Sequence, residues 1–121
     1  MSTTDLDANK DIIRAVVAAW NERDFDRFTL MGCDATLSVG GVTMPCDPRG
    51  TRAIAEAWTR AFPDWQSHLR GLVAEDDRVV AHMPSSGTFA HPVGGIAPTG
   101  QHAHVDEIVI FRIADGRIVE A

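Results

Sequence analysis

The sequence has no tyrosine, only two cysteines and no long apolar run among its 121 residues. Cys33 and Cys46 form no CxxC motif and are too few for a disulfide framework, so we expect two reduced thiols. No apolar stretch approaches the roughly 20 residues needed to cross a bilayer. The first residues are polar and acidic, unlike a secretory signal. We therefore expect a cytoplasmic protein that does not enter a membrane.

Clustered positive charge is missing as well. Seventeen acidic residues against eleven basic ones give a formal net charge of −6, and the basic residues are scattered singly. Such a chain repels phosphate backbones and anionic lipids, so we expect no nucleic-acid or membrane-surface partner. No phosphate-binding glycine loop, nucleophile elbow or Cys/His pairing of known spacing occurs, so no cofactor is expected. Small molecules or other proteins remain as partners.

What is present fits one globular domain covering residues 1–121, since 45% of the residues are apolar and 23% charged. Two segments have the three- and four-residue apolar spacing of helices with one buried face. The first runs from Ala8 to about Arg23, with Asp5 or Asp7 as its cap. The second covers residues 51–62, is capped by its first residue and ends before Pro63.

The apolar period changes to two in the second half of the chain, which indicates strands. The Asp115-Gly116 dipeptide is typical of a tight hairpin turn, and residues 43–50, with two prolines, are predicted to form a loop. The predicted strands are Asp34–Val39, Ser67–Ala74, Arg78–Phe89, Gln101–Ile113 and one that starts at Arg117. Helices followed by antiparallel strands predict an α+β fold, with a curved sheet wrapped over the N-terminal helices around a cone-shaped pocket.

Three segments are more specific than this general pattern. They are AFPDW (61–65), GIAPTG (95–100) and IFRIADGRIVE (110–120). In this order and spacing they resemble the SnoaL-like polyketide cyclases, within the nuclear-transport-factor-two-like superfamily that also holds ketosteroid isomerase and limonene epoxide hydrolase. The resemblance covers nearly the whole chain and implies a cystatin-like α+β barrel. It implies less about function, because this fold supports many chemistries.

Two chemistries of the superfamily do not fit the matching positions. The isomerases use a carboxylate base with a phenol and a protonated acid, and the positions that match are Val39, Val16 and Val109. Aliphatic side chains can neither transfer a proton nor donate a hydrogen bond. The epoxide hydrolases use an Arg and an Asp on a middle strand, where this chain has Pro84 and Ser86. Neither residue can act as a carboxylate base.

The SnoaL-like aldol cyclases resemble the chain most. Their acid/base aspartate lies on the last strand and would match a position just past Ala121. The strand that starts at Arg117 is therefore expected to be incomplete in this sequence. The resemblance leaves two alternatives, namely that the protein lacks this group or that the chain continues beyond the given residues.

The acid/base candidates inside the pocket are His82 and Glu107. The family's strand register implies that even-numbered residues of 78–89 and odd-numbered residues of 101–113 face the pocket. A histidine held by a buried carboxylate can act as an acid/base near neutral pH. The alternative is structural, with His82 hydrogen-bonded at an edge and Glu107 paired with an arginine. The predicted substrate-binding residues are Val16, Trp20, Leu37, Val39, Trp58, Phe62, Ser86, Thr88, Val109 and Phe111.

His102, His104 and Asp106 form a second constellation, because residues two apart share one face of a strand. Their spacing permits a zinc site, but a hydrogen-bonded or interfacial histidine pair is the default, so we predict no metal. The register implied by the resemblance puts them on the face opposite the pocket. Ile108 and Ile110 continue that face, which suits a homodimer formed through the outer face of the sheet.

The sequence thus predicts a SnoaL-like small-molecule enzyme of the cyclase or isomerase type. It would act by cofactor-free acid/base chemistry on a hydrophobic carbonyl or polyketide-like compound. The alternative is a non-catalytic ligand-binding or accessory protein that keeps the pocket. The aliphatic residues at family carboxylate positions, Val39 and Val109, favour this alternative, and the resemblance of the whole chain favours the enzyme.

Overall fold

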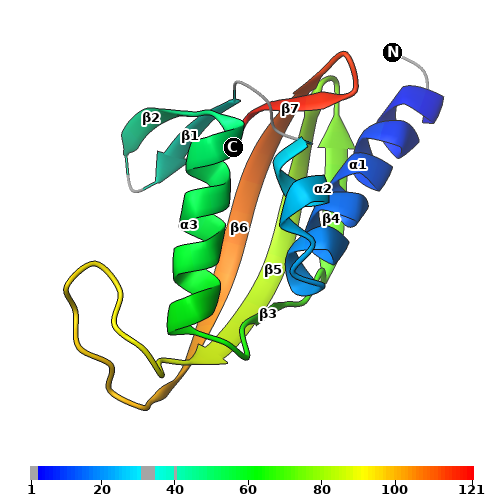
Figure 1. Ribbon diagram of the computed structural model, residues 1–121. Helices are drawn as coiled ribbons and strands as arrows, with labels where there is room; N and C mark the ends of the chain where they lie inside the picture. Colours follow the sequence, from blue (N-terminus) through cyan, green and yellow to red (C-terminus); the bar gives the residue numbers. More distant parts are fainter. Residues whose placement is uncertain (1–2, 31–34, 40) are drawn as a thin grey trace.

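The computed structural model describes residues 3–30, 35–39 and 41–121. These residues form three helices, which lie together on one face of a long curved sheet (Figure 1). The helices are α1 (Thr3–Asn21), α2 (Phe25–Leu30) and α3 (Pro48–Ala61). The strands are β1 (Ala35–Val39), β2 (Val42–Cys46), β3 (Gln66–Ser67), β4 (Gly71–Glu75), β5 (Arg78–Thr88), β6 (His102–Ala114) and β7 (Arg117–Glu120). The predicted α+β architecture with N-terminal helices and a curved sheet is confirmed.

The sheet has the order β2-β1-β7-β6-β5-β3, and β4 also pairs with β5. The long strands β5 and β6 pair antiparallel throughout, from Arg78 opposite Arg112 to Thr88 opposite His102. β7 pairs with β6 only at residues 112–114 of that strand. Within the described ranges, residues 102–111 of β6 therefore have a strand partner on the β5 side alone. No helix of the described residues is long and apolar enough to span a membrane.

The first helix begins earlier than its apolar spacing predicts. It starts at Thr3, not Ala8, so Asp5 and Asp7 lie inside the helix and neither is its cap. Asp5 stands in the first turn, where its negative charge favours the exposed N–H groups of the helix end.

The third helix also begins earlier than predicted, at Pro48. The cap is Asp47, whose Oδ1 accepts a hydrogen bond of 2.6 Å from the N–H of Gly50. Proline is favoured at the first helical position because that position needs no N–H donor. Thr51 is thus an interior residue, and the predicted end of the helix before Pro63 is confirmed.

The predicted loop 43–50 contains β2, and Pro45 is tolerated there because β2 is an edge strand. The strand predicted over 67–74 is split into β3 and β4. The register on β5 changes by one residue between Ser67 opposite Ser85 and Gly71 opposite His82, which separates the two pieces. Of the two cysteines, Cys33 and the side chain of Cys46 lie outside the described residues.

The predicted turn between β6 and β7 is confirmed. Asp115 and Gly116 have φ angles of 52° and 75°, the left-handed conformation that a two-residue hairpin turn requires. The turn sends β7 back along β6, and the chain then reaches β1, where Thr36 and Glu120 are parallel partners. This arrangement closes the upper part of the sheet over the helices.

The core lies between α1 and the inner face of β5, β6 and β7. Its buried members are Ile13, Val16, Val17, Val79, Ala81, Met83, Phe111, Ile113 and Ile118. A second, aromatic cluster fills the lower end, where Phe62 stacks on Trp58 at 4.6 Å and on Phe89 at 5.1 Å. Gly87 belongs to this end, because a Cβ there would lie 2.8 Å from the Trp65 ring.

Candidate functional site

A cavity of about 550 Å³ lies between α1, α3 and the inner face of the sheet. Its wall is overwhelmingly apolar, and Glu107 is the single ionisable side chain among the described residues that line it. The lining residues are Val16, Val17, Trp20, Phe28, Thr36, Leu37, Thr51, Ile54, Ala55, Trp58, Trp65, Ser67, Met83, Val105, Glu107, Val109, Phe111, Ile118 and Ala121. A lone carboxylate in an apolar cavity is a candidate for ligand orientation or proton transfer.

Glu107 is held at the cavity by the pairing of β6 with β5, which places it opposite Met83. Ser85 Oγ donates to Glu107 Oε1 at 3.2 Å and lies 3.0 Å from Ser67 Oγ. Both serines are buried, with 4% of Ser85 and 8% of Ser67 exposed. Asn21, at the end of α1, fixes β3 by exchanging two hydrogen bonds of 2.8 and 2.9 Å with the backbone of Ser67. A polar row thus runs from α1 to Glu107.

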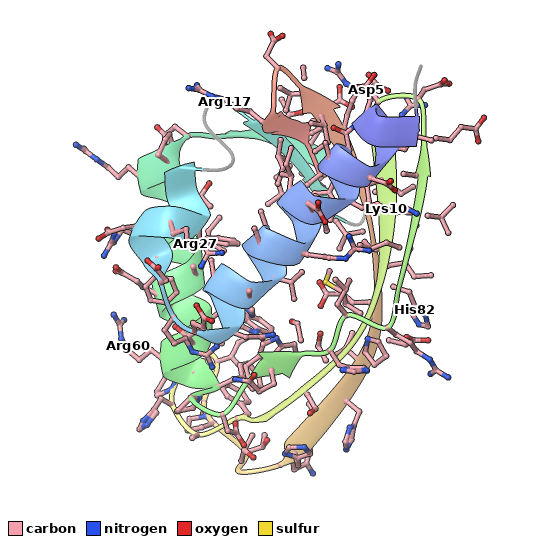
Figure 2. The ribbon with its side chains drawn as sticks, turned by 90° about the vertical axis from the view of Figure 1, so that its right-hand side faces the viewer. Asp5, Lys10, Arg27, Arg60, His82 and Arg117 are labelled. Carbon is pink, nitrogen blue, oxygen red and sulfur yellow. The ribbon has the colours of Figure 1, made fainter. Side chains whose placement is uncertain are left out.

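The predicted register of β5 is wrong by one residue. Odd-numbered residues of β5 are buried and even-numbered ones are half-buried, so His82, Ser86 and Thr88 lie on the outer face. Directly opposite residues of an antiparallel pair share a face, and Met83 is the partner of Glu107. Once Glu107 faces the cavity, the even-numbered residues of β5 must therefore point away. Figure 2 shows His82 on the side of the strands that faces away from the helices.

On the outer face, His82 is paired with Asp106 and not with Glu107. The distance between His82 Nε2 and Asp106 Oδ1 is 2.5 Å, and 37% of the His82 side chain and 72% of the Asp106 side chain are exposed. Ion pairs this open to solvent contribute little to stability. The structure therefore separates the two predicted acid/base residues onto opposite faces of one sheet.

Thr88 joins the outer rim of the sheet to the loop after α3. Its N–H and Oγ1 donate to the Asp64 carboxylate at 2.7 and 2.8 Å, and His102 Nδ1 lies 3.0 Å from the same Oγ1. These bonds from Thr88 lower the pKa of Asp64. Thr88 has a structural partner here, outside the cavity in which the sequence placed it.

The predicted alternative of a metal site at His102, His104 and Asp106 finds no support in this geometry. The two imidazoles are in contact, with ring centroids 4.8 Å apart, while Asp106 turns to His82. Across residues 3–30, 35–39 and 41–121, no group of three or more His, Cys, Asp or Glu side chains is arranged to hold a metal ion.

Six of the predicted substrate-binding residues line the cavity: Val16, Trp20, Leu37, Trp58, Val109 and Phe111. Their role in binding stays a prediction. Phe62 lies outside the lining, in the aromatic cluster, because it stacks between Trp58 and Phe89. Val39 lies in β1, and its side chain is outside the described residues. The sequence reasoning missed Ser67 and Ser85, which carry the polar row.

Comparisons with known proteins agree with this architecture. The model of the family described as SnoaL-like polyketide cyclase matches residues 10–121. The fold is similar to AclR of Streptomyces galilaeus, a proposed hydroxylase, with a TM-score of 0.82, 26% identity and coverage of 95% of this chain and 86% of that one. TsrD of Streptomyces laurentii gives a TM-score of 0.79 at 27% identity, covering 99% and 87%.

A third structure, IdmH of Streptomyces antibioticus, described as a proposed polyketide cyclase, gives a TM-score of 0.76. Its identity is 24%, with coverage of 93% of this chain and 87% of that one, so it supports the fold alone. A search among curated protein sequences finds no match.

Proposed function

This chain belongs to the SnoaL-like polyketide cyclase family, and from that premise we propose that it is a small-molecule enzyme with Glu107 as its acid/base. The substrate class is a hydrophobic carbonyl compound of the polyketide type, and the chemistry needs no cofactor. The observation that supports this proposal is the position of Glu107 as the one ionisable side chain among the described residues that line an apolar cavity of about 550 Å³.

The proposed reaction begins with a proton transfer. The Glu107 carboxylate takes a proton from a carbon next to a carbonyl group, and the electron pair of that C–H bond forms an enolate. In a cyclase, the enolate carbon then bonds to a second carbonyl carbon of the same molecule, and the resulting alkoxide takes the proton back from Glu107. The cycle returns the carboxylate and consumes no other reagent. Positioned general bases of this kind accelerate reactions by roughly 10²- to 10⁴-fold.

The wall supplies binding through side chains that are mainly apolar, with Thr36, Thr51 and Ser67 as further polar members. Trp20, Trp58 and Phe111 line the cavity with flat aromatic surfaces, which suits a planar ring system. The description of the family as polyketide cyclases agrees with a compound of the polyketide type as ligand. His82 has no part in this proposal, because it lies outside the cavity.

The second candidate is a binding or accessory protein without turnover. One observation favours it: no cationic or phenolic side chain appears among the described lining residues to stabilise an enolate oxygen. A carboxylate in such a wall can orient a ligand without reacting with it. The two candidates share the cavity and differ in whether Glu107 moves a proton.

Proton exchange separates these two functions. The probe is 2-tetralone, a bicyclic ketone, whose α-protons exchange with D₂O in a reaction followed by NMR. We expect the protein to accelerate this exchange, Glu107→Gln to remove at least about 99% of the acceleration, and Asp106→Asn, on the neighbouring residue of β6, to retain it. Quenching of tryptophan fluorescence measures binding independently, since Trp20, Trp58 and Trp65 line the cavity. Binding without accelerated exchange would support the accessory protein.

We also propose that the outer face of β4, β5 and β6 binds a second copy of the chain. Val73, Ile108 and Ile110 are 68%, 65% and 56% exposed there, an apolar surface uncommon on monomers. On β6 this surface lies between Asp106 and Arg112, so a two-fold axis across the strands would set each carboxylate near the guanidinium of the other copy. We expect a dimer in sedimentation equilibrium that Ile108→Lys converts to a monomer; a monomeric wild type would contradict the proposal.

A further inference from the structure

Ser85, one of the two serines near Glu107, interrupts an otherwise apolar face of β5. Val79, Ala81 and Met83 precede Ser85 on the inner face, and all three are buried. Ser85 is itself 4% exposed, although a hydroxyl in such a place is costly unless it is hydrogen-bonded. Packing alone therefore does not explain a hydroxyl on this face, but its hydrogen-bond partners do.

The Ser85 hydroxyl has one proton and three possible acceptors. Its Oγ lies within hydrogen-bond distance of Ser67 Oγ at 3.0 Å, Met83 O at 3.2 Å and Glu107 Oε1 at 3.2 Å, and one hydroxyl carries one proton. A charged acceptor forms the stronger bond, so the proton goes to Glu107 when the carboxylate is ionised. Ser67 Oγ and Met83 O are the other two possible acceptors of Ser85 Oγ, and neither carries a charge. The Ser85 hydroxyl is therefore directed to one carboxylate oxygen of Glu107.

Ser67, whose Oγ lies 3.0 Å from Ser85 Oγ, is held in place as well. The side-chain amide of Asn21 accepts from the Ser67 N–H and donates to the Ser67 carbonyl, across 46 positions of sequence. This pair of bonds anchors β3 to the end of α1, so the Ser67 hydroxyl has a defined place. Glu107 Oε2, in contrast, has no hydrogen-bond partner in the part of the chain that is described.

We propose that Ser85 is a positioning residue that gives the two oxygens of the Glu107 carboxylate different roles. Oε1 is held by the Ser85 hydroxyl, and Oε2 is left to meet the ligand and take the proton. This inference rests on the proposed function of Glu107. It adds that the orientation of the base is set from β5, and not by β6 alone.

The test compares Ser85→Ala with Ser86→Ala, the same change on the next residue but on the outer face. Two readouts are used, namely the rate of 2-tetralone exchange at one fixed pH and the side-chain NMR couplings of Glu107, which report one rotamer or an average. Ser85→Thr, which keeps a hydroxyl, is the rescue variant. Urea denaturation confirms that each variant is folded.

For Ser85→Ala we expect roughly a tenfold lower exchange rate constant, because a hydrogen bond to a charged group is lost. We expect unchanged binding by fluorescence, averaged Glu107 couplings and partial recovery in Ser85→Thr. Ser86→Ala should match the wild type in every readout.

The outcomes separate the two proposals. If Glu107→Gln abolishes exchange while Ser85→Ala equals Ser86→Ala in rate and couplings, the positioning role is overturned and the function of Glu107 stands. If the wild type shows no accelerated exchange, the proposed function fails. In that case the couplings alone decide whether Ser85 holds the carboxylate: averaging in Ser85→Ala supports it, and unchanged couplings reject it.

Discussion

The two faces of the β5–β6 pair carry similar polar pairs in different surroundings. On the inner face, Ser85 donates to Glu107 inside an apolar cavity. On the outer face, His82 meets Asp106, whose side chain is 72% exposed. The outer pair has the residue types of acid/base catalysis, yet it is open to water, which screens it. The comparison teaches that the face of the strand, and not the residue type, decides which carboxylate can act on a ligand.

The largest effect expected from this comparison is on folding. Ala81 is fully buried on the inner face, and Val73 is 68% exposed on the outer one. Ala81→Asp should lower the free energy of unfolding by at least about 3 kcal/mol, because it buries a charge without a partner. On the Ile108→Lys background, which is expected to keep the protein monomeric, Val73→Asp should change it by less than about 0.5 kcal/mol. Urea denaturation measures both, and equal effects would mean that the faces are assigned wrongly.

A smaller effect is expected where β5 meets the aromatic cluster. A Cβ at Gly87 would lie 2.8 Å from the Trp65 ring and 3.1 Å from its Cα, so Gly87→Ala forces the backbone of the loop to move. We expect a loss of about 1–3 kcal/mol in the free energy of unfolding. Ser86→Ala, its neighbour on the outer face, is the control and should lie within about 0.5 kcal/mol of the wild type.

The outer pair itself should matter little. We expect His82→Ala to change the free energy of unfolding by less than about 1 kcal/mol and the 2-tetralone exchange rate by less than about twofold, because the pair is exposed. The same exchange assay as for Glu107 checks it. A loss of exchange as large as that of Glu107→Gln would mean that His82 takes part in the reaction, and would contradict the proposal that only the inner face acts on the ligand.

The smallest expected effect is on the stability of the protein at low pH. The bonds from Thr88 lower the pKa of Asp64, so its ionised form adds stability at pH values above the ordinary pKa of the carboxyl. This contribution is lost as the pH falls below about 4, through the lowered pKa. We expect the melting temperature of the wild type to fall more between pH 5 and pH 3 than that of Asp64→Asn. Parallel curves for the two proteins would contradict this role of Asp64.

Local patterns account for the parts of the fold that the sequence predicted correctly. The two long strands and the Asp115-Gly116 turn are confirmed, because period-two spacing and a positive φ dipeptide act within a few residues. The cap Asp47 also had a local signal, since Pro48 marks a first helical position. The strand β2 was predicted as a loop because it contains a proline. Proline is tolerated at the edge of a sheet, but the position of a strand in the sheet depends on the fold of the whole chain.

The face of β5 could have been predicted from this chain's own residues. Val79, Ala81 and Met83 are apolar at odd positions, while His82, which follows Ala81, is polar at an even one. That alternation favours odd-numbered residues inside. The prediction followed the family's register instead, and a slip of one residue moved every side chain of the strand to the other face.

The polar row beside Glu107 had no local signal. Serine occurs in strands, turns and caps alike, so Ser67 and Ser85 do not stand out in the sequence. Their link to Asn21 joins residues 46 positions apart and exists only once α1 and β3 are packed together. The candidate carboxylate could thus be predicted from the sequence, and its partners could not.

The most direct test of the account is an NMR measurement of where 2-tetralone binds. Intermolecular NOEs from the ligand to assigned methyl groups distinguish the two faces of β5 and β6. We expect NOEs to Met83, Val105 and Val109, which line the cavity with Glu107, and none to Ile108 and Ile110 on the outer face. NOEs confined to Ile108 and Ile110 would place the ligand beside His82 and contradict the central claim.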